Sequence, residues 1–183
     1  MSIYFSSDLH LGHDKPFVWG ARGFKSVEEM NRKIIENFIE AVQPDDELYL
    51  LGDLILGDIE EGKKMLRRIP GHVHVILGNH DSAAKIAFYE SLGWDCQWGL
   101  CKKIGGYTIL MSHWATITRN FDLKPLKREV INFHGHTHQE CHFTHGEFCM
   151  YHVGVDSHNC YPVLFEDAID DIIKDRKREG KIV

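Results

Sequence analysis

The clearest indication of the fold lies in the stretch HVHVILGNHD, residues 72–81. Valines alternate with histidines in its first half, a period typical of a β-strand. Gly78 then ends the strand, because glycine lets the backbone turn sharply. An asparagine, a histidine and an aspartate follow at once. The stretch therefore predicts a strand that delivers polar side chains at its carboxyl end.

Four other predicted strands end in the same kind of residue. SIYFSSD leads to Asp8 and His10, ELYLLGD ends at Gly52 and Asp53, YTILMSH ends at His113, and VINFHGHTH ends in His136 and His138. Sites in α/β sheets gather at the carboxyl ends of strands. We therefore expect these carboxylate, imidazole and carboxamide groups to converge.

The segments between these strands have helical patterns. Ser26 and Glu29 have the spacing of a capping box, and apolar residues recur at helical intervals from Val27 to Val42. Further helices are predicted over EEGKKMLRRI, over residues 82–92 and over EDAIDDIIKDRKREGK, with hairpin turns at Gly105-Gly106 and near His145-Gly146. Strands alternating with helices, followed by hairpins, predict an α/β protein with a mixed sheet or two stacked sheets.

The composition is that of a soluble globular protein. The 183 residues suit one domain, 43% are hydrophobic and 26% are charged. We see neither a signal-like N-terminus nor the ~18 consecutive apolar residues of a membrane span, so we expect a cytoplasmic protein with no membrane partner. A net charge of -6 counts against broad, non-specific binding to duplex nucleic acid. The thirteen histidines are the unusual number, since histidine is the commonest metal ligand.

The polar groups at the strand ends predict a metal centre. They supply nitrogen and oxygen ligands and no thiolate, which suits Mn, Fe, Zn or Ni, and seven groups are too many for one tetrahedral ion. The seven are Asp8, His10, Asp53, Asn79, His113, His136 and His138. Two ions ~3.5 to 4 Å apart can hold a bridging hydroxide and clamp an in-line phosphoryl displacement.

The ordered motifs Asp8-x-His10, Gly52-Asp53, Gly78-Asn79-His80-Asp81, His113 and Gly135-His136-x-His138 resemble those of the calcineurin-like metallophosphoesterase family, in its small bacterial or phage form. Each motif alone is weak, but the five together, in this order, are specific. The resemblance implies one such domain over residues 1–183. It also implies an α/β fold in which two mixed β-sheets form a four-layer αββα sandwich, with the metal site at the carboxyl ends of strands.

The resemblance also implies roles for the site residues. One metal would be bound by Asp8, His10, Asp53 and His138, and the other by Asp53, Asn79, His113 and His136, with Asp53 as the bridge. His80 would be the acid or transition-state donor, oriented by Asp81. Apart from the resemblance, Gly135 marks the end of the strand, so we expect His134 to be its last residue and either a structural group or one that supports a ligand. The implied activity is hydrolysis of a phosphoester, with two divalent ions, Mn favoured, and small diesters, including nucleotide ones, as the favoured substrates.

Four further residues are candidates for contacting substrate, although each has an ordinary structural alternative. His13 follows the first motif closely, and Arg22 and Arg119 have the guanidinium fork that matches phosphate oxygens. Trp114 directly follows His113 and could form a wall of the site. Surface arginines and an aromatic residue that packs a loop down are the alternative interpretations.

Other functions remain open on the sequence alone. A phosphomonoesterase or a nuclease of the same family would use the same residues, although the chain has no basic track for nucleic acid. A non-catalytic scaffold with this fold would be expected to have lost ligands, whereas all seven and His80 are present. Metal storage would predict ligands crowded in one tract. The expected partner is a small phosphoester, with no stable nucleic-acid complex, and the oligomeric state is open.

Overall fold

The computed structural model describes residues 1–118, 124–144, 149–178 and 180 of the chain. Within these residues, nine strands form two sheets, and each sheet is mixed. The first sheet has the order β4-β3-β2-β1-β9, and the second has the order β5-β6-β7-β8. The prediction of an α/β fold with two mixed sheets is confirmed.

The first sheet consists of the strands that alternate with helices along the first half of the chain, together with the strand that precedes the last helix. Its members are β1 (Ile3–Ser6), β2 (Glu47–Leu50), β3 (His72–Ile76), β4 (Asp95–Gln97) and β9 (Val163–Leu164). The strands β1 to β4 are parallel, and only β9 pairs antiparallel, against β1. The carboxyl ends of β1, β2 and β3 therefore lie side by side at the same end of the sheet.

The second sheet contains the predicted hairpin. Its strands are β5 (Leu100–Ile104), β6 (Tyr107–Met111), β7 (Val130–His134) and β8 (Met150–His152). The β5 and β6 strands are antiparallel across Gly105 and Gly106, while β6, β7 and β8 are parallel. His134 is the last residue of β7, as predicted. The second predicted turn, at His145, lies outside the described residues.

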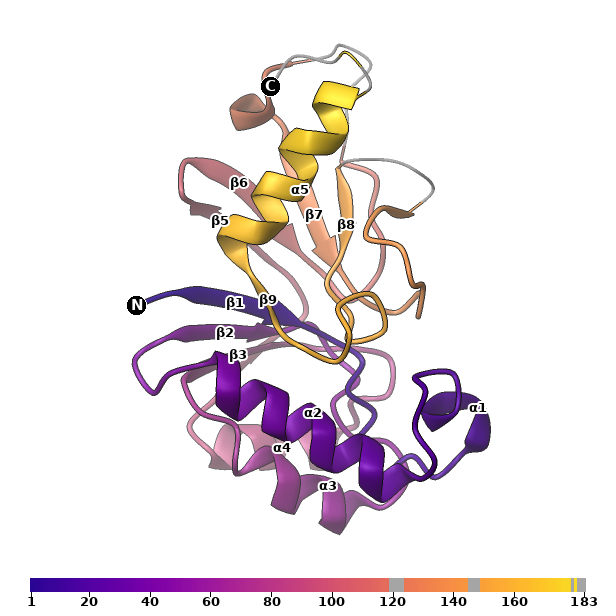
Figure 1. The fold of residues 1–183 in the computed structure, drawn as a ribbon. Coiled ribbons are helices and arrows are strands. Elements are labelled where there is room, and N and C mark those ends of the chain that lie inside the picture. The colour runs from indigo at the N-terminus through magenta and orange to yellow at the C-terminus, as the bar shows by residue number, and fades with distance from the viewer. Residues whose placement is uncertain (119–123, 145–148, 179, 181–183) are drawn as a thin grey trace.

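Helices α2, α3 and α4 cover the outer face of the first sheet, and α5 packs against the second sheet at the opposite end (Figure 1). The helices are α1 (Pro16–Trp19), α2 (Val27–Ala41), α3 (Ile59–Leu66), α4 (Ala83–Ser91) and α5 (Phe165–Arg178), with a 3-10 turn at Leu126–Arg128. Ser26 caps α2, because its Oγ accepts a hydrogen bond from Glu29 N at 3.2 Å. None of the described helices is long and apolar enough to cross a membrane.

Two apolar clusters hold the layers together. One lies between the first sheet and helices α2 to α4, and the other joins the two sheets and α5. Phe5 is central to the second cluster: its ring stacks on Tyr49 at 5.3 Å and meets the Phe133 ring edge-on at 4.8 Å. The contact between Phe5 and Phe133 connects β1 directly to β7, so it helps to fix the relative position of the sheets.

We expect Phe5→Ala to lower the free energy of unfolding by about 3–5 kcal/mol, because it removes a fully buried ring from between the sheets. Urea denaturation should show a lower midpoint with an unchanged slope. Ile39→Ala on α2, at a side chain that is 43% exposed, is the control and should change stability by less than about 0.5 kcal/mol. Equal effects of the two substitutions would contradict this account of the core.

Candidate metal centre

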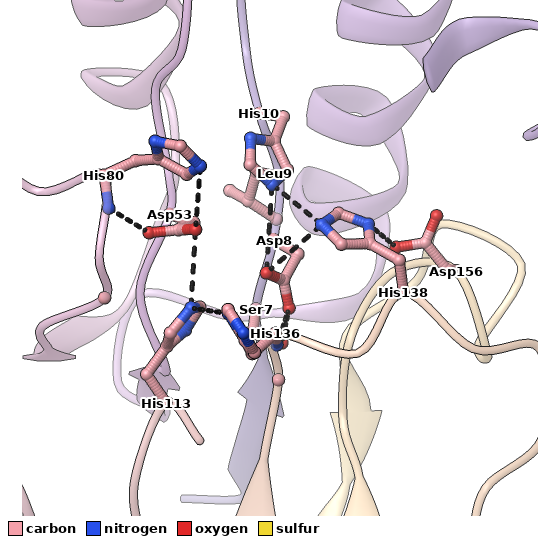
Figure 2. Close-up of polar contacts among 12 residues, drawn as sticks. Ser7, Asp8, Leu9, His10, Asp53, His80, His113, His136, His138 and Asp156 are labelled. Atoms are coloured by element: carbon pink, nitrogen blue, oxygen red, sulfur yellow. Dashed lines mark hydrogen bonds and ion pairs between the residues drawn. The ribbon is translucent and has the colours of Figure 1, made fainter. Parts of the chain in front are cut away.

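The polar strand ends converge where the two sheets meet (Figure 2). The first sheet supplies residues that follow β1, β2 and β3, and the second supplies residues that follow β6 and β7. Backbone hydrogen bonds tie these segments together, with Asp8 N donating to Gly52 O at 3.0 Å and Gly135 N donating to His113 O at 3.0 Å. The seven predicted ligands thus come from five strand ends of two sheets.

One group of potential ligand atoms consists of Asp8, His10 and His138, whose donor atoms lie within 4.8 Å of one another. The Nε2 atoms of His10 and His138 face each other at 3.0 Å. Asp8 Oδ1 lies 3.8 Å from the first of these nitrogens and 3.7 Å from the second. The three atoms surround a common point between the sheets.

The second group consists of Asp8, Asp53 and His113. Asp53 Oδ2 lies 3.4 Å from His113 Nε2. The same nitrogen lies 3.0 Å from Asn79 Oδ1 and 3.2 Å from His136 Nδ1. Asp8 is therefore the residue common to both groups, whereas the family resemblance gave the shared position to Asp53.

The surroundings of Asp8 fit a bound cation. The side chain is fully buried, and its Oδ2 accepts hydrogen bonds from Ser7 Oγ at 2.6 Å and from His136 N at 2.9 Å. Its Oδ1 is buried and has no hydrogen-bond partner in the described chain. Burial raises the pKa of this carboxyl, because the charged form loses its water. A cation between Asp8 Oδ1 and the facing imidazoles would compensate that charge.

The ring of His10 is held in the form that binds metals. Burial, reinforced by the neighbouring His138, lowers the pKa of His10 to about 3. The imidazole is therefore neutral near pH 7, with a lone pair available on nitrogen. On the other side of the group, burial opposes the charged form of His138, but the hydrogen bond to Asp156 and the charges of Asp8 and Asp156 together outweigh burial and raise the pKa of His138.

The backbone at the centre is strained. Seven described non-glycine residues have a positive φ, and five of them are predicted ligands: Asp8, His10, Asp53, His136 and His138. This left-handed region is uncommon for non-glycine residues, and such strain gathers at functional sites. Gly78 and Gly135 allow the close packing here, since a Cβ would lie 2.3 Å from Asp53 Oδ1 at the first position and 2.3 Å from Asp8 Oδ2 at the second.

His80 lies beside the centre, with its main chain fixed and its ring accessible. Its N–H donates to Asp53 Oδ1 at 2.9 Å, and its carbonyl accepts from Lys85 Nζ at 2.7 Å. The side chain is 42% exposed, and its Nε2 lies 3.9 Å from Asp53 Oδ2. The ring can therefore meet a substrate without loss of a strong contact.

Asp81 has a different role from the predicted one. Its Oδ2 accepts from the N–H groups of Asp53 at 3.0 Å and Gly78 at 2.8 Å, and its Oδ1 accepts from Tyr89 Oη at 2.9 Å. These three contacts hold the carboxylate beneath the loop that carries Asn79 and His80. Asp81 therefore orients the loop backbone rather than the His80 ring.

Arg22 also departs from its prediction as a phosphate clamp. Its guanidinium, 2% exposed, bonds Asp156 at 2.8 Å and 3.1 Å and the carbonyls of Asp8 at 2.7 Å and Leu9 at 3.1 Å. Asp156 in turn lies 3.0 Å from His138 Nδ1. Arg22 thus braces a carboxylate that contacts His138, and these contacts already occupy its buried guanidinium.

The sequence reasoning missed Asp156 as a residue of the site. The segment GVDSHNCY, which contains it, lies beyond the last motif and has no helical or strand period. The signal was its position: a carboxylate follows an apolar run directly after β8. A histidine that binds a metal through one nitrogen commonly donates from the other to a carboxylate.

Two of the remaining substrate candidates lie beside different predicted ligands. The His13 ring lies 5.8 Å from that of His10, and burial together with His80 lowers its pKa. The Trp114 ring, 40% exposed, lies 5.2 Å from that of His113. Arg119 lies outside the described residues.

Residues 1–156 match the calcineurin-like phosphoesterase superfamily domain, and this range contains every described residue of the centre. The chain belongs to this superfamily. Members of the superfamily typically bind divalent metals, in agreement with the two groups of acidic and imidazole ligands.

Three similar proteins show how far the likeness extends. An uncharacterized protein of Methanocaldococcus jannaschii is 38% identical over 81 residues, which are 43% of this chain and 46% of that one, so the match spans less than half of the relative. A protein of unknown function from Aquifex aeolicus has the same fold, with a TM-score of 0.65, 22% identity and coverage of 93% of this chain and 98% of the other. An archaeal phosphodiesterase is more distant, with a TM-score of 0.49, 14% identity and coverage of 84% and 82%.

We expect Asp156→Asn to weaken binding of one metal ion to this phosphoesterase domain by about 10- to 100-fold, because His138 loses its carboxylate partner. Competition with a metal-sensitive dye should show a lower affinity for that ion, while the affinity for the other ion stays near its wild-type value. Asp45→Asn, at an exposed position, is the control. Unchanged affinity in Asp156→Asn would mean that His138 is oriented by other contacts.

Stability of the metal-stripped domain should fall in mild acid because of His152. This ring is fully buried, and burial lowers its pKa to about 3. In the unfolded chain the ring takes up a proton near pH 6.5, whereas in the folded domain it stays neutral down to about pH 3. The free energy of unfolding therefore keeps its full value above pH 6.5 and falls between pH 6.5 and pH 3, by at most about 1.4 kcal/mol per pH unit. Urea denaturation in chelator should show a shallower decline for His152→Gln. Parallel declines would refute this assignment.

Proposed function

We propose that the chain is a hydrolase that uses two divalent transition-metal ions to cleave a small phosphodiester. The observation that supports this most directly is the pair of ligand groups that meet at the buried Asp8, beside the accessible His80 ring. The superfamily supports phosphoester hydrolysis as the class of reaction. Manganese is the favoured metal, with Fe, Zn and Ni as alternatives, since the donors are nitrogen and oxygen atoms alone.

The two ions would be held by different sides of the centre. His10 and His138 would hold one, Asn79, His113 and His136 the other, and the carboxylates of Asp8 and Asp53 would lie between them. Each carboxylate already accepts a backbone hydrogen bond on one oxygen, from His136 N and His80 N respectively. Each therefore has its other oxygen available for a metal.

When bound, the ions would activate a water molecule and neutralise charge on the phosphoryl oxygens. The chain itself would supply the donor for the leaving oxygen. His80 is suited to this, because its N–H and C=O are fixed by Asp53 and Lys85 while its ring is open to solvent. A positioned imidazole of this kind contributes about 10²- to 10⁴-fold to rate.

The distribution of charge favours a diester over a monoester. The described residues that line the cavity beside His10 include no lysine or arginine, and Arg22 is already bound to Asp156. A monoester dianion would gain from such a cation, whereas a diester carries one negative charge fewer. The partner we propose is thus a small phosphodiester, in the cytoplasm, without a stable nucleic-acid complex.

Two other functions compete with this proposal. A phosphomonoesterase or nuclease would use the same centre, although the net charge of -6 disfavours extended nucleic acid. A non-catalytic scaffold would have no need for strained ligands or for an accessible His80. Purified protein, stripped and reloaded with each metal, should bind about two ions per chain and hydrolyse bis(4-nitrophenyl) phosphate faster than 4-nitrophenyl phosphate. If neither ester were hydrolysed with any of these metals, the proposed enzymatic activity would be refuted.

We expect His80→Ala to keep both metals and to lower the rate by about 10²- to 10⁴-fold, because the leaving oxygen loses its donor. The loss should be largest with a poor leaving group. Metal content and steady-state rates on aryl and alkyl esters measure both parts, with His72→Ala at an exposed strand start as the control. Loss of metal from His80→Ala would place His80 among the ligands instead.

A further inference from the structure

A cavity of about 670 Å³ opens beside the candidate metal centre. Its volume lies in the range of small-molecule sites. Histidines and Asp156 of the centre and its surroundings form one part of the lining, and apolar side chains form the rest. The apolar residues are Phe17, Val18, Ala21 and Leu56. The cavity therefore joins a phosphate-binding side to an apolar side within one space.

Phe17 is the largest apolar side chain of this lining, and it is 72% exposed. It belongs to α1, a short helix with no buried residue, which projects away from α2 to α4 (Figure 1). The core therefore does not account for this ring. A single exposed apolar side chain is ordinary, but Phe17 also lines the cavity beside the centre together with three other apolar residues.

A row of rings connects Phe17 to the centre. The Phe17 and His13 rings meet edge to face at 5.8 Å and 89°. The His13 ring lies 5.8 Å from that of His10, which lies 5.7 Å from that of His80. The His13 Nδ1 atom is buried and has no hydrogen-bond partner in the described chain. A ligand that extends from the centre along this row would pass imidazole rings before it reached the Phe17 ring.

We propose that this cavity binds a planar aromatic group on one arm of the phosphodiester, with Phe17 as the residue that selects it. The inference rests on the proposed function for the position of the phosphoryl group. A flat ring gains from aromatic contact with Phe17 as well as from removal of apolar surface from water, whereas a small alkyl arm would leave the cavity unfilled. The ring can belong to a simple aryl ester or to a nucleobase.

Binding of matched phosphonates to the metal-loaded protein tests this without any need for turnover. Calorimetry should show that phenylphosphonate binds about tenfold more tightly than methylphosphonate. Phe17→Ala should abolish that preference through weaker binding of phenylphosphonate alone, and its exposed position leaves the fold intact. Trp98→Ala removes an aromatic residue that is 67% exposed and does not line the cavity, so it should preserve the preference.

The outcomes separate this inference from the proposed function. Equal binding of the two phosphonates by the wild-type protein, or a preference that survives in Phe17→Ala, would overturn the role of the cavity. If the protein preferred phenylphosphonate through Phe17 but had no phosphoesterase activity, the role of the cavity would be supported and the proposed enzymatic function would be refuted. Adenosine monophosphate against ribose 5-phosphate distinguishes the sources: a preference in this pair identifies a nucleobase, and one confined to the phosphonates identifies an aryl ester.

Discussion

The structure depends on a carboxylate charge that is buried between two sheets. Asp8 lies just beyond β1, yet its Oδ2 accepts a hydrogen bond from His136 N, which follows β7 in the other sheet. The same oxygen accepts a second hydrogen bond, from Ser7 Oγ. A buried ion is costly unless it is paired or coordinated, and only the second oxygen remains to meet that need. His10, His138 and His113 each place a nitrogen within 4.8 Å of an Asp8 oxygen, so a cation bound among them would meet that need.

Much of the fold could be predicted because its determinants are local. The period of the apolar residues after Ser26 and the glycines at positions 52 and 78 act within a few residues, and they place α2 and the ends of β2 and β3. The convergence of the ligands followed from one rule about parallel strands. The two mixed sheets, which the strands alternating with helices and the later hairpins indicated, are confirmed.

The contacts of Asp81 and Arg22 could not be predicted from the sequence. Asp81 is adjacent to His80, but its carboxylate points back to the N–H of Asp53, which is 28 residues earlier. Arg22 has the chemistry of a phosphate ligand, but Asp156 lies 134 residues away and binds it first. Which partner a charged side chain takes depends on tertiary geometry, and neither a period nor a motif encodes that choice.

The division of the ligands between the sheets gives a bound metal a mechanical role. Each group combines residues of the first sheet with a histidine of the second: His138 in one case and His113 in the other. Such a coordination sphere could not close until the sheets had met, so metal binding would be coupled to the packing of the two sheets. Once in place, the ions would cross-link the two halves of the molecule. A shift of one sheet relative to the other would then change the positions of the metal ligands.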